Sequence, residues 1–476
     1  MTFVGRRREL DALAAHLDVV REGRRADPGV AVMLRGRRRI GKSRLVDEFT
    51  RRCGAPVVYF QAARRAPLTE ELASLTLAVA TSALPDASIA SDTAPRTLTA
   101  ALTLLASALP DDQPSVVVID ELPWLLEHID GGAGELQRAW DTRLSKKPVL
   151  LLLLGSDLAM MEQLTAPDQP FFGRAAEMVV DPLTPTDVSR MIGGSAFDGF
   201  DAYLVTGGLP LVAQEWDQGW STRRFLEHSF SSSTSALVVA GSRALDSEFL
   251  EASRARGVLT AIGGRGERTF GAIQSDGGAE ALNATTLTST LRMLRDKRVV
   301  AADEPLSARS APKNIRYRIA DPALRFWLAF VEPALGEVDR GRPDLALARV
   351  DRGFAAWRGR AVEPVVRDAL SRLLPDDAWP HVDQVGGWWP RTNVPEIDVV
   401  GASWDRTVQL VGTIKWRATP LTTGDLATLS ADATSVPGVG VGTPLVGVCP
   451  AGSDAPGFST VWDAADLLDA WPSAAR

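Results

Sequence analysis

Between residues 30 and 54 the chain reads as a buried strand, a glycine-bearing loop and a helix, and few folds place these three in succession. Residues 36–43 are Gly-Arg-Arg-Arg-Ile-Gly-Lys-Ser, which fits the phosphate-binding pattern G-x-x-x-x-G-K-[ST]. The apolar residues 30–34 predict the strand, and residues 42–53 carry apolar side chains at helical spacing before Gly54. The segment therefore predicts a nucleotide-binding P-loop rather than a basic turn.

Each residue type in this loop has a physical role in binding a triphosphate. Gly36 and Gly41 let successive N–H groups point at the phosphates beside a helix N-terminus, which favours negative charge. We expect Lys42 to contact the β- and γ-phosphates of ATP and the Ser43 hydroxyl to bind Mg²⁺. The candidate nucleotide-binding residues are Gly36, Arg37, Arg38, Arg39, Ile40, Gly41, Lys42, Ser43 and Arg44. The pattern does not decide whether the three arginines sense a neighbouring subunit, touch phosphates or face water.

A second segment, residues 115–121, consists of β-branched residues that end in two acids, Asp120 and Glu121. An apolar strand buried on both faces delivers its last residues to the carboxyl edge of a parallel sheet, where ligands bind. We expect Asp120 to bind Mg²⁺ together with Ser43, and Glu121 to polarise the water that attacks the γ-phosphate. An acidic pair can also simply begin a helix, but the P-loop upstream favours catalysis.

Two more polar residues are catalytic candidates. The predicted strand at residues 149–154 ends in Gly155-Ser156-Asp157, where Ser156 is placed either to sense the γ-phosphate or to cap a helix with Asp157. Arg174 follows Phe171-Phe172-Gly173 and precedes a short strand, residues 178–180. Its guanidinium either stabilises transition-state charge or forms a surface salt bridge.

These segments resemble a known family. Phe3-Val4-Gly5-Arg6, the P-loop, Ile119-Asp120-Glu121, Leu154-Gly155-Ser156 and Gly173-Arg174 are similar to segments of the archaeal-type ATPases, in the STAND division of P-loop ATPases related to AAA+ proteins. The resemblance implies an α/β core with a parallel sheet of ASCE type and an ATP-driven switch. Gly208-Leu209-Pro210 resembles a motif that faces the nucleotide in the helical lid of STAND ATPases, although a helix ending at Gly207 and restarting at Pro210 explains the same residues.

The resemblance divides the chain into a P-loop core at residues 1–190, a helical lid at 191–242 and a winged-helix domain at 243–331. Predicted helices at residues 249–262, 269–273 and 285–297 precede two strands at 299–301 and 316–319, as a winged helix requires. The third helix is rich in hydroxyl and basic residues suited to DNA or RNA: Thr285, Thr286, Thr288, Ser289, Arg292, Arg295, Lys297 and Arg298. Such domains also dock within their own chain. Residues 333–343, with Gly336 and Gly341, suggest a linker.

Residues 345–476 resemble the PD-(D/E)XK nuclease domain, an α/β restriction-endonuclease-like fold that follows the ATPase in this family. A predicted helix at residues 355–374 presents Glu363, and two predicted strands carry Asp398 and Lys415. The family has an acid two residues before the lysine, where this chain has Thr413. A neutral hydroxyl weakens Mg²⁺ binding, so the sequence favours a domain that binds or docks over one that cleaves. Glu396 is an alternative acid on the same strand face as Asp398.

Composition narrows the function classes. At 476 residues the chain has room for about three domains, and its net charge of −7 gives no global argument for nucleic acid. The two cysteines are far apart in sequence and indicate neither a disulfide framework nor a metal site. No stretch approaches the roughly 20 apolar residues of a membrane span, and the first residues lack a secretory signal, so we expect a cytoplasmic protein without membrane contact.

The function expected from the sequence is an ATP-binding and ATP-hydrolysing switch that controls winged-helix and nuclease-like modules, and that assembles with copies of itself when nucleotide is bound. Two other functions remain open at this point. One is an ATP-regulated, metal-dependent nuclease with its site at Asp398, Lys415 and Glu363. The other is a non-catalytic assembly protein that binds nucleotide only for stability.

Overall fold

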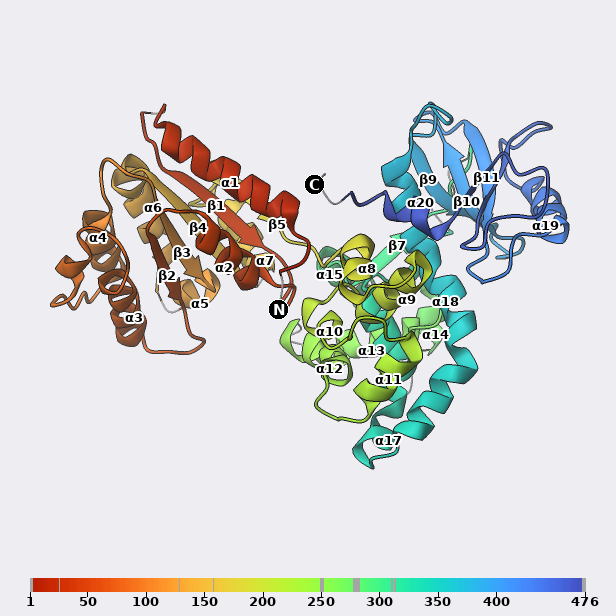
Figure 1. The fold of residues 1–476 in the computed structure, drawn as a ribbon, viewed down its shortest axis with the longest axis horizontal. Helices are drawn as coiled ribbons and strands as arrows, with labels where there is room; N and C mark the ends of the chain where they lie inside the picture. Colours follow the sequence, from red (N-terminus) through yellow and green to blue (C-terminus); the bar gives the residue numbers. More distant parts are fainter. Residues whose placement is uncertain are drawn as a thin grey trace. The chain divides into compact units, whose positions relative to one another are not determined.

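The fold comes from a computed structural model, which describes residues 3–24, 26–127, 129–156, 158–248, 252–276, 283–309, 311 and 314–472. The chain divides into two compact units, Met1–Pro182 and Leu183–Arg476. Figure 1 traces the elements of each unit in sequence order. None of the helices within the described ranges is long and apolar enough to cross a membrane.

The first unit is built on a parallel sheet of five strands in the order β2-β3-β4-β1-β5 (Figure 1). The strand that ends in the acidic pair is separated from the P-loop strand by one other strand, so the predicted ASCE-type order is confirmed. Pairing of β1 with β4 sets Arg35 opposite Gly155, and pairing of β2 with β3 sets Gln61 opposite Asp120. The strands are β1 (Val30–Arg35), β2 (Val57–Gln61), β3 (Ser115–Asp120), β4 (Val149–Gly155) and β5 (Ala175–Val179).

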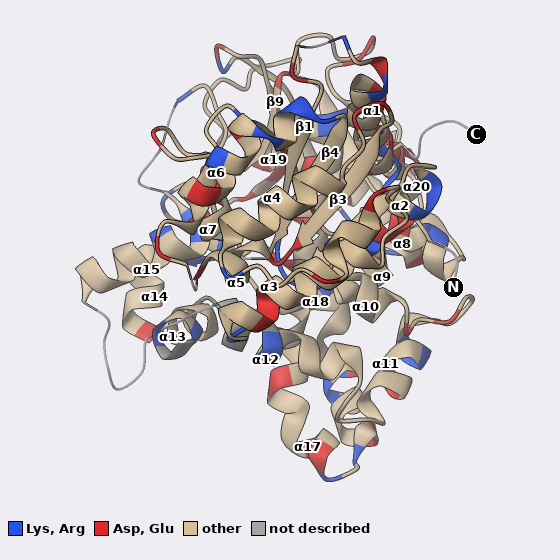
Figure 2. Ribbon diagram, turned by 90° about the vertical axis from the view of Figure 1, so that its left-hand side faces the viewer, with Lys and Arg blue, Asp and Glu red and all other residues tan. Residues whose placement is uncertain are grey.

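The central strands β3 and β4 are buried along their whole length, as their unbroken apolar sequences predict. On one face, Met33, Val117 and Leu151 pack with residues of α3, α4 and α6. Helix α4 carries no charged residue and is drawn without blue or red in Figure 2. The helices of this unit are α1 (Arg7–Glu22), α2 (Lys42–Arg52), α3 (Leu68–Ala80), α4 (Leu98–Ala108), α5 (Leu122–Glu127), α6 (Gly132–Thr142) and α7 (Leu158–Thr165), with short 3₁₀ turns η1 (Ala87–Ala90) and η2 (Leu144–Lys146).

The second unit begins with five helices. Helix α9 ends at Gly207, whose φ of 59° is left-handed, and α10 begins at Pro210, so the helix break predicted there is present. The five are α8 (Pro185–Ile192), α9 (Ala196–Thr206), α10 (Pro210–Ala213), α11 (Thr222–Phe230) and α12 (Ala236–Glu248).

Three helices and a small antiparallel sheet follow. Phe249, the predicted start of the first helix, lies outside the described residues, and the helix is described from Ala252. Thr269 belongs to a strand, so the second helix starts at Phe270. The elements are α13 (Ala252–Ile262), α14 (Phe270–Asp276) and α15 (Ala284–Asp296), with β6 (Arg268–Thr269), β7 (Val300–Asp303) and β8 (Arg316–Ile319) in the order β6-β8-β7.

The linker predicted at residues 333–343 is helical instead. Helix α18 starts at Pro343, a position where proline fits a helix, and not at residue 355. Trp357 of α18 stacks edge-on against Phe326 and Phe330, with ring centroids 5.4 and 5.6 Å apart, which buries the chain on both sides of the segment. The elements are α16 (Pro322–Phe326), the π-helix η3 (Trp327–Val331), η4 (Glu332–Ala334), α17 (Leu335–Asp339) and α18 (Pro343–Leu373).

A second, mixed sheet completes the chain, in the order β13-β12-β11-β10-β9. Strands β9, β10 and β11 are antiparallel neighbours, whereas β11, β12 and β13 run parallel. One apolar core extends from Leu183 to Trp471 and includes residues of the helices, of the small sheet and of the mixed sheet. A second apolar cluster packs α19 against the mixed sheet. The elements are β9 (Gln384–Trp388), β10 (Ile397–Ala402), β11 (Val408–Ile414), β12 (Leu445–Val448) and β13 (Thr460–Trp462), with α19 (Thr423–Ala433) and α20 (Ala464–Leu468).

Candidate functional site

The P-loop connects β1 to α2 at the carboxyl edge of the parallel sheet. Gly36 has no room for a side chain, because a Cβ there would lie 2.4 Å from the Val180 carbonyl oxygen and 2.5 Å from Ile40 Cδ1. Gly41 has a φ of 88°, which a side chain would strain. Both glycines of the motif are thus required by the backbone path.

Lys42 is buried, and its ammonium group lies inside the loop. Its Nζ donates hydrogen bonds to the carbonyl oxygens of Gly36, at 2.7 Å, and Arg37, at 3.0 Å. The loop therefore holds a positive charge at its centre, as a triphosphate site needs.

Ser43 and Asp120, which are far apart in sequence, meet at this edge of the sheet. The Ser43 hydroxyl donates a 2.7 Å hydrogen bond to Oδ2 of Asp120, and Oδ1 of Asp120 accepts from the Glu121 amide at 2.9 Å. A hydroxyl beside a carboxylate is an oxygen donor set that suits Mg²⁺. The residues predicted to bind magnesium therefore fit that ion.

Tyr59 is a member of this cluster that sequence reasoning missed. Its hydroxyl, on the middle residue of the neighbouring strand β2, donates a 3.0 Å hydrogen bond to Oδ2 of Asp120. Burial and the Asp120 carboxylate both raise the pKa of Tyr59, so the phenol keeps its proton and remains a donor. The strand order was the missing information, because only that order makes β2 the neighbour of β3.

Glu121 is held by Ser156, so two predicted catalytic residues are in direct contact. The Ser156 hydroxyl, at the end of β4, donates to Oε2 of Glu121 at 2.9 Å, and Arg38 of the P-loop donates to Ser156 Oγ at 3.3 Å. The Arg38 guanidinium also lies 5.8 Å from the ring centroid of Trp124. Asp157, the alternative capping residue, lies outside the described residues. A chain of contacts thus runs from the loop to the candidate base.

Arg6 supports the loop from the N-terminus. It is buried, and its Nη2 donates a 2.8 Å hydrogen bond to the Ile40 carbonyl oxygen, while Nη1 pairs with Glu9. The sequence marked Gly5-Arg6 as part of a family motif without giving it a role. Only the structure reveals that this arginine fixes the loop backbone beside Gly41.

The remaining candidates are Arg174 and the other arginines of the P-loop segment. Arg174 forms a bidentate ion pair with the exposed Asp141 of α6, with its Nε at 2.8 Å from Oδ1, an arrangement that favours the surface salt bridge over a transition-state role. Arg39 and Arg44 are exposed, and Arg37 is half-buried.

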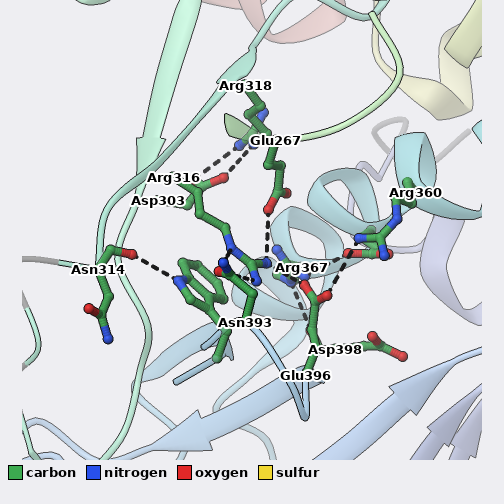
Figure 3. A network of polar contacts seen from close by, with 12 residues as sticks. Glu267, Asp303, Asn314, Arg316, Arg318, Arg360, Arg367, Asn393, Glu396 and Asp398 are labelled. Carbon is green, nitrogen blue, oxygen red and sulfur yellow. Dashed lines mark hydrogen bonds and ion pairs between the residues drawn. The ribbon is translucent and has the colours of Figure 1, made fainter. Parts of the chain in front are cut away.

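Among the C-terminal candidates, Asp398 and Thr413 meet in the mixed sheet, and Arg367 of α18 links Glu363 to Asp398. Asp398 of β10 accepts at Oδ2 from the Thr413 hydroxyl, at 3.0 Å, and from the Ile414 amide, at 2.8 Å. Glu363 of α18 is buried and pairs with Arg367 one turn later, at 2.9 Å. Lys415 lies one residue beyond β11, and its backbone amide donates to the Val448 carbonyl oxygen. Glu396, the alternative acid, pairs with Arg316 at 2.6 Å, as Figure 3 shows.

Burial raises the pKa of Glu363 to about 8, although the adjacent Arg367 guanidinium opposes the shift. The described residues contain no group of three or more His, Cys, Asp or Glu side chains arranged to hold a metal ion. Oδ2 of Asp398 already accepts two hydrogen bonds and Glu363 already holds a guanidinium, so the residues at this second site do not fit the Mg²⁺ that a nuclease of the resembled type needs.

Two family models match parts of the chain. Residues 2–128 match a family described as "AAA ATPase domain". Residues 327–428 match a family described as "Archaea bacterial proteins of unknown function". The first match contains the P-loop and the acidic pair, and the second contains Glu363, Asp398 and Thr413.

Three similar proteins are archaeal. An uncharacterized protein of Methanocaldococcus jannaschii is 23% identical over 285 residues, a match that covers 58% of this chain and 62% of that relative. A Walker-type ATPase of Pyrococcus abyssi is 20% identical, with a TM-score of 0.48 over 68% of this chain and 96% of that one. The ORC2 protein of Aeropyrum pernix, in ADPNP–ADP complexes, is 14% identical, with a TM-score of 0.44 over 72% of this chain and 95% of that one.

Proposed function

Since residues 2–128 form an AAA ATPase domain, we propose that the chain is an ATP-driven switch, in which nucleotide at the P-loop controls residues 183–476. One observation carries the proposal: the 2.7 Å hydrogen bond between Ser43 and Asp120 joins the P-loop hydroxyl to the acid at the end of β3. In P-loop NTPases these two residue types hold Mg²⁺ together.

The loop residues bind the triphosphate in this proposal. Backbone N–H groups between Gly36 and Gly41 point at the phosphates, and the buried Lys42 exchanges its bonds to loop carbonyls for bonds to phosphate oxygens. Magnesium, when bound at Ser43 and Asp120, neutralises charge on the phosphate oxygens. Tyr59 and the Glu121 amide keep the Asp120 carboxylate in one orientation.

Glu121 is the proposed general base for hydrolysis. It lies directly after Asp120, and Ser156 fixes one of its oxygens by a hydrogen bond. Because Arg38 bonds to the same serine, the P-loop and the base are linked through one hydroxyl. The hydrogen bond from Ser156 orients the Glu121 carboxylate for the attacking water. Slow turnover, which suits a switch, is part of the proposal.

The second unit carries the proposed output modules: a lid at residues 191–242, a winged helix at 243–331 and a nuclease-like domain at 345–476. Three helices, of which the last is followed by the hairpin β7-β8 with β6 paired to β8, support the winged helix. On α15 a row of hydroxyl and basic side chains is exposed, which supports contact with DNA or RNA through Thr285, Thr288, Ser289, Arg292 and Arg295. The contact is tested by measuring the affinity for DNA at several salt concentrations. We expect the affinity to fall as salt rises, and binding to be lost in Arg292→Ala.

The ATPase is tested with three variants of the full chain. We expect Glu121→Gln to bind ATP and to turn it over at least a hundredfold more slowly, in line with loss of a general base. Lys42→Ala should lose binding itself, and Glu127→Gln, an exposed acid on the next helix, serves as the matched control. Turnover in Glu121→Gln equal to that of the control would overturn the assignment of the base.

Nucleotide-dependent assembly with copies of the same chain is part of the proposal. Size-exclusion chromatography with and without a non-hydrolysable ATP analogue measures it directly. An elution volume that does not change with the analogue would leave a monomeric switch.

A further inference from the structure

An arginine lies among the residues that a nuclease of the resembled type would use to hold a metal. Glu363 and Arg367 are one turn apart on α18, Asp398 is on β10, and Thr413 is on β11. Figure 3 shows the Arg367 side chain near Asp398 and Glu396, the residue directly before β10.

The Arg367 guanidinium is held in place by specific contacts. Its Nη2 donates to Oε2 of Glu363 at 2.9 Å, and its Nε donates to the backbone carbonyl oxygen of Asp398 at 2.8 Å. On the other side lies Gly387 of β9, where a Cβ would be 3.0 Å from Arg367 Cζ. Two acceptors and a residue without a side chain thus enclose a buried cation.

The neighbouring acids already have hydrogen-bond or ion-pair partners. Oδ2 of Asp398 accepts from both the Thr413 hydroxyl and the Ile414 amide. Glu396 pairs with Arg316 and, at 3.5 Å, with Arg360. Arg316 also bonds to Asn393 and lies 4.3 Å from the ring centroid of Trp389 (Figure 3). A metal ion would have to displace these partners to gain ligands.

We propose that Arg367 is the resident cation of the C-terminal sheet, and that its guanidinium supplies, between Glu363 and Asp398, the positive charge that a divalent metal supplies in a nuclease. A guanidinium can neutralise and orient acids, but it has no open coordination position for water. The C-terminal domain is then folded and complete without a divalent metal, and it does not cleave nucleic acid. This inference does not rest on the proposed ATPase.

The first test uses nucleotide-free full-length protein and Mn²⁺ alone as the probe, followed by electron paramagnetic resonance of the free ion. We expect the native chain and Asp398→Asn to bind the same number of Mn²⁺ ions, because Asp398 contributes no metal site. Loss in Asp398→Asn of an ion that the native chain binds would overturn the inference.

The second test compares Arg367→Met with Arg372→Met on the same helix. Arg372 also pairs with an acid four residues before it, Asp368, but both side chains of that pair are about half exposed. We expect Arg367→Met to lower the melting temperature strongly, and Mn²⁺ to recover part of the loss, whereas Arg372→Met shows neither effect. If Mn²⁺ changed the melting temperature of both variants equally, Arg367 would be only a member of a buried ion pair and would not take the place of a metal.

A third variant covers the case in which Arg367→Met does not fold. Glu363→Gln/Arg367→Met removes both charges together, and replacing a buried pair costs far less than breaking it. We expect this double variant to fold and to remain insensitive to Mn²⁺, because the acid that the ion needs is gone. Stabilisation of the double variant by Mn²⁺ would contradict the assignment of Glu363 as the acid that holds the cation.

Discussion

The Tyr59 hydroxyl lies 3.0 Å from Oδ2 of Asp120, on the adjacent strand, and donates a hydrogen bond to the same oxygen that accepts from Ser43. The carboxylate proposed to bind magnesium is thus oriented by donors from a second strand and from the P-loop. This relationship leads to the first prediction.

Tyr59→Phe should raise the Mg²⁺ concentration needed for half-maximal ATP hydrolysis by about fivefold, the equivalent of one hydrogen bond worth roughly 1 kcal/mol. The maximal rate at saturating Mg²⁺ should stay within twofold of the native rate. A magnesium titration of ATPase activity measures both. Tyr317→Phe, in β8 of the second unit, is the control. An unchanged magnesium requirement would show that Tyr59 only packs against the acid.

Ser156→Ala should lower kcat about tenfold, since Glu121 loses the hydroxyl that orients it. The Kd for ATP should change little, because Ser156 bonds to the base and to Arg38 rather than to the loop backbone. Steady-state kinetics together with nucleotide-binding titrations separate the two quantities. A weaker affinity at an unchanged kcat would instead assign Ser156 to nucleotide binding.

Arg6→Met should destabilise the P-loop, because the Ile40 carbonyl oxygen loses its buried donor, at a cost of about 1–3 kcal/mol. We expect a lower melting temperature for the first unit and weaker binding of ATP. Arg7→Met, the next residue and an exposed one, is the control. Equal melting temperatures for the two variants would refute a supporting role for Arg6.

Arg174→Ala and Asp141→Ala should have the same small effect, because exposed ion pairs contribute about 0–1 kcal/mol to stability. Neither substitution should change kcat. If Arg174→Ala alone slowed hydrolysis, its guanidinium would act on the nucleotide and not only on Asp141. The measurement is kcat at saturating ATP, with thermal denaturation alongside.

The stability of the second unit should fall as the pH rises from about 5 to about 8, relative to that of Glu363→Gln. Burial raises the pKa of Glu363 from the ordinary 4.5 to about 8, so the folded chain holds this proton more tightly than the unfolded chain does. The stabilisation is complete below the ordinary pKa and is lost as the pH passes the folded-state value. Urea denaturation at several pH values tests the sign. Parallel curves for the native chain and the glutamine variant would exclude it.

The nucleotide site was predictable because its residues follow apolar strands. Parallel strands end at the same edge, so the acids after β3 and the serine after β4 had to lie near the P-loop once the sheet formed. The contact of Tyr59 with Asp120 was not predictable, because the sequence of a short strand does not show which strand lies next to it. The predicted linker was wrong because the two prolines, Pro333 and Pro343, suggested an irregular segment. Both lie in the first turn of a helix, and aromatic side chains pack the helices on either side.

The role of Arg367 could not be read from its spacing. An arginine four residues after a glutamate is an ordinary helix-surface pair, as Arg372 and Asp368 are on the same helix. What distinguishes Arg367 is the strand next to it: the pairing of β9 with β10 brings Gly387 against its guanidinium. This contact depends on the tertiary structure, and the sequence around Arg367 does not predict it.

The apolar core that extends from Leu183 to Trp471 limits how the chain can be shortened or recombined with related proteins. Helices α8 to α12, the small antiparallel sheet and the mixed sheet are not separable parts, because any truncation between them cuts through shared packing around Trp327 and Trp357. Shortened chains ending near residue 340 should therefore aggregate. Swaps between related proteins should succeed only when the whole block after residue 182 is exchanged.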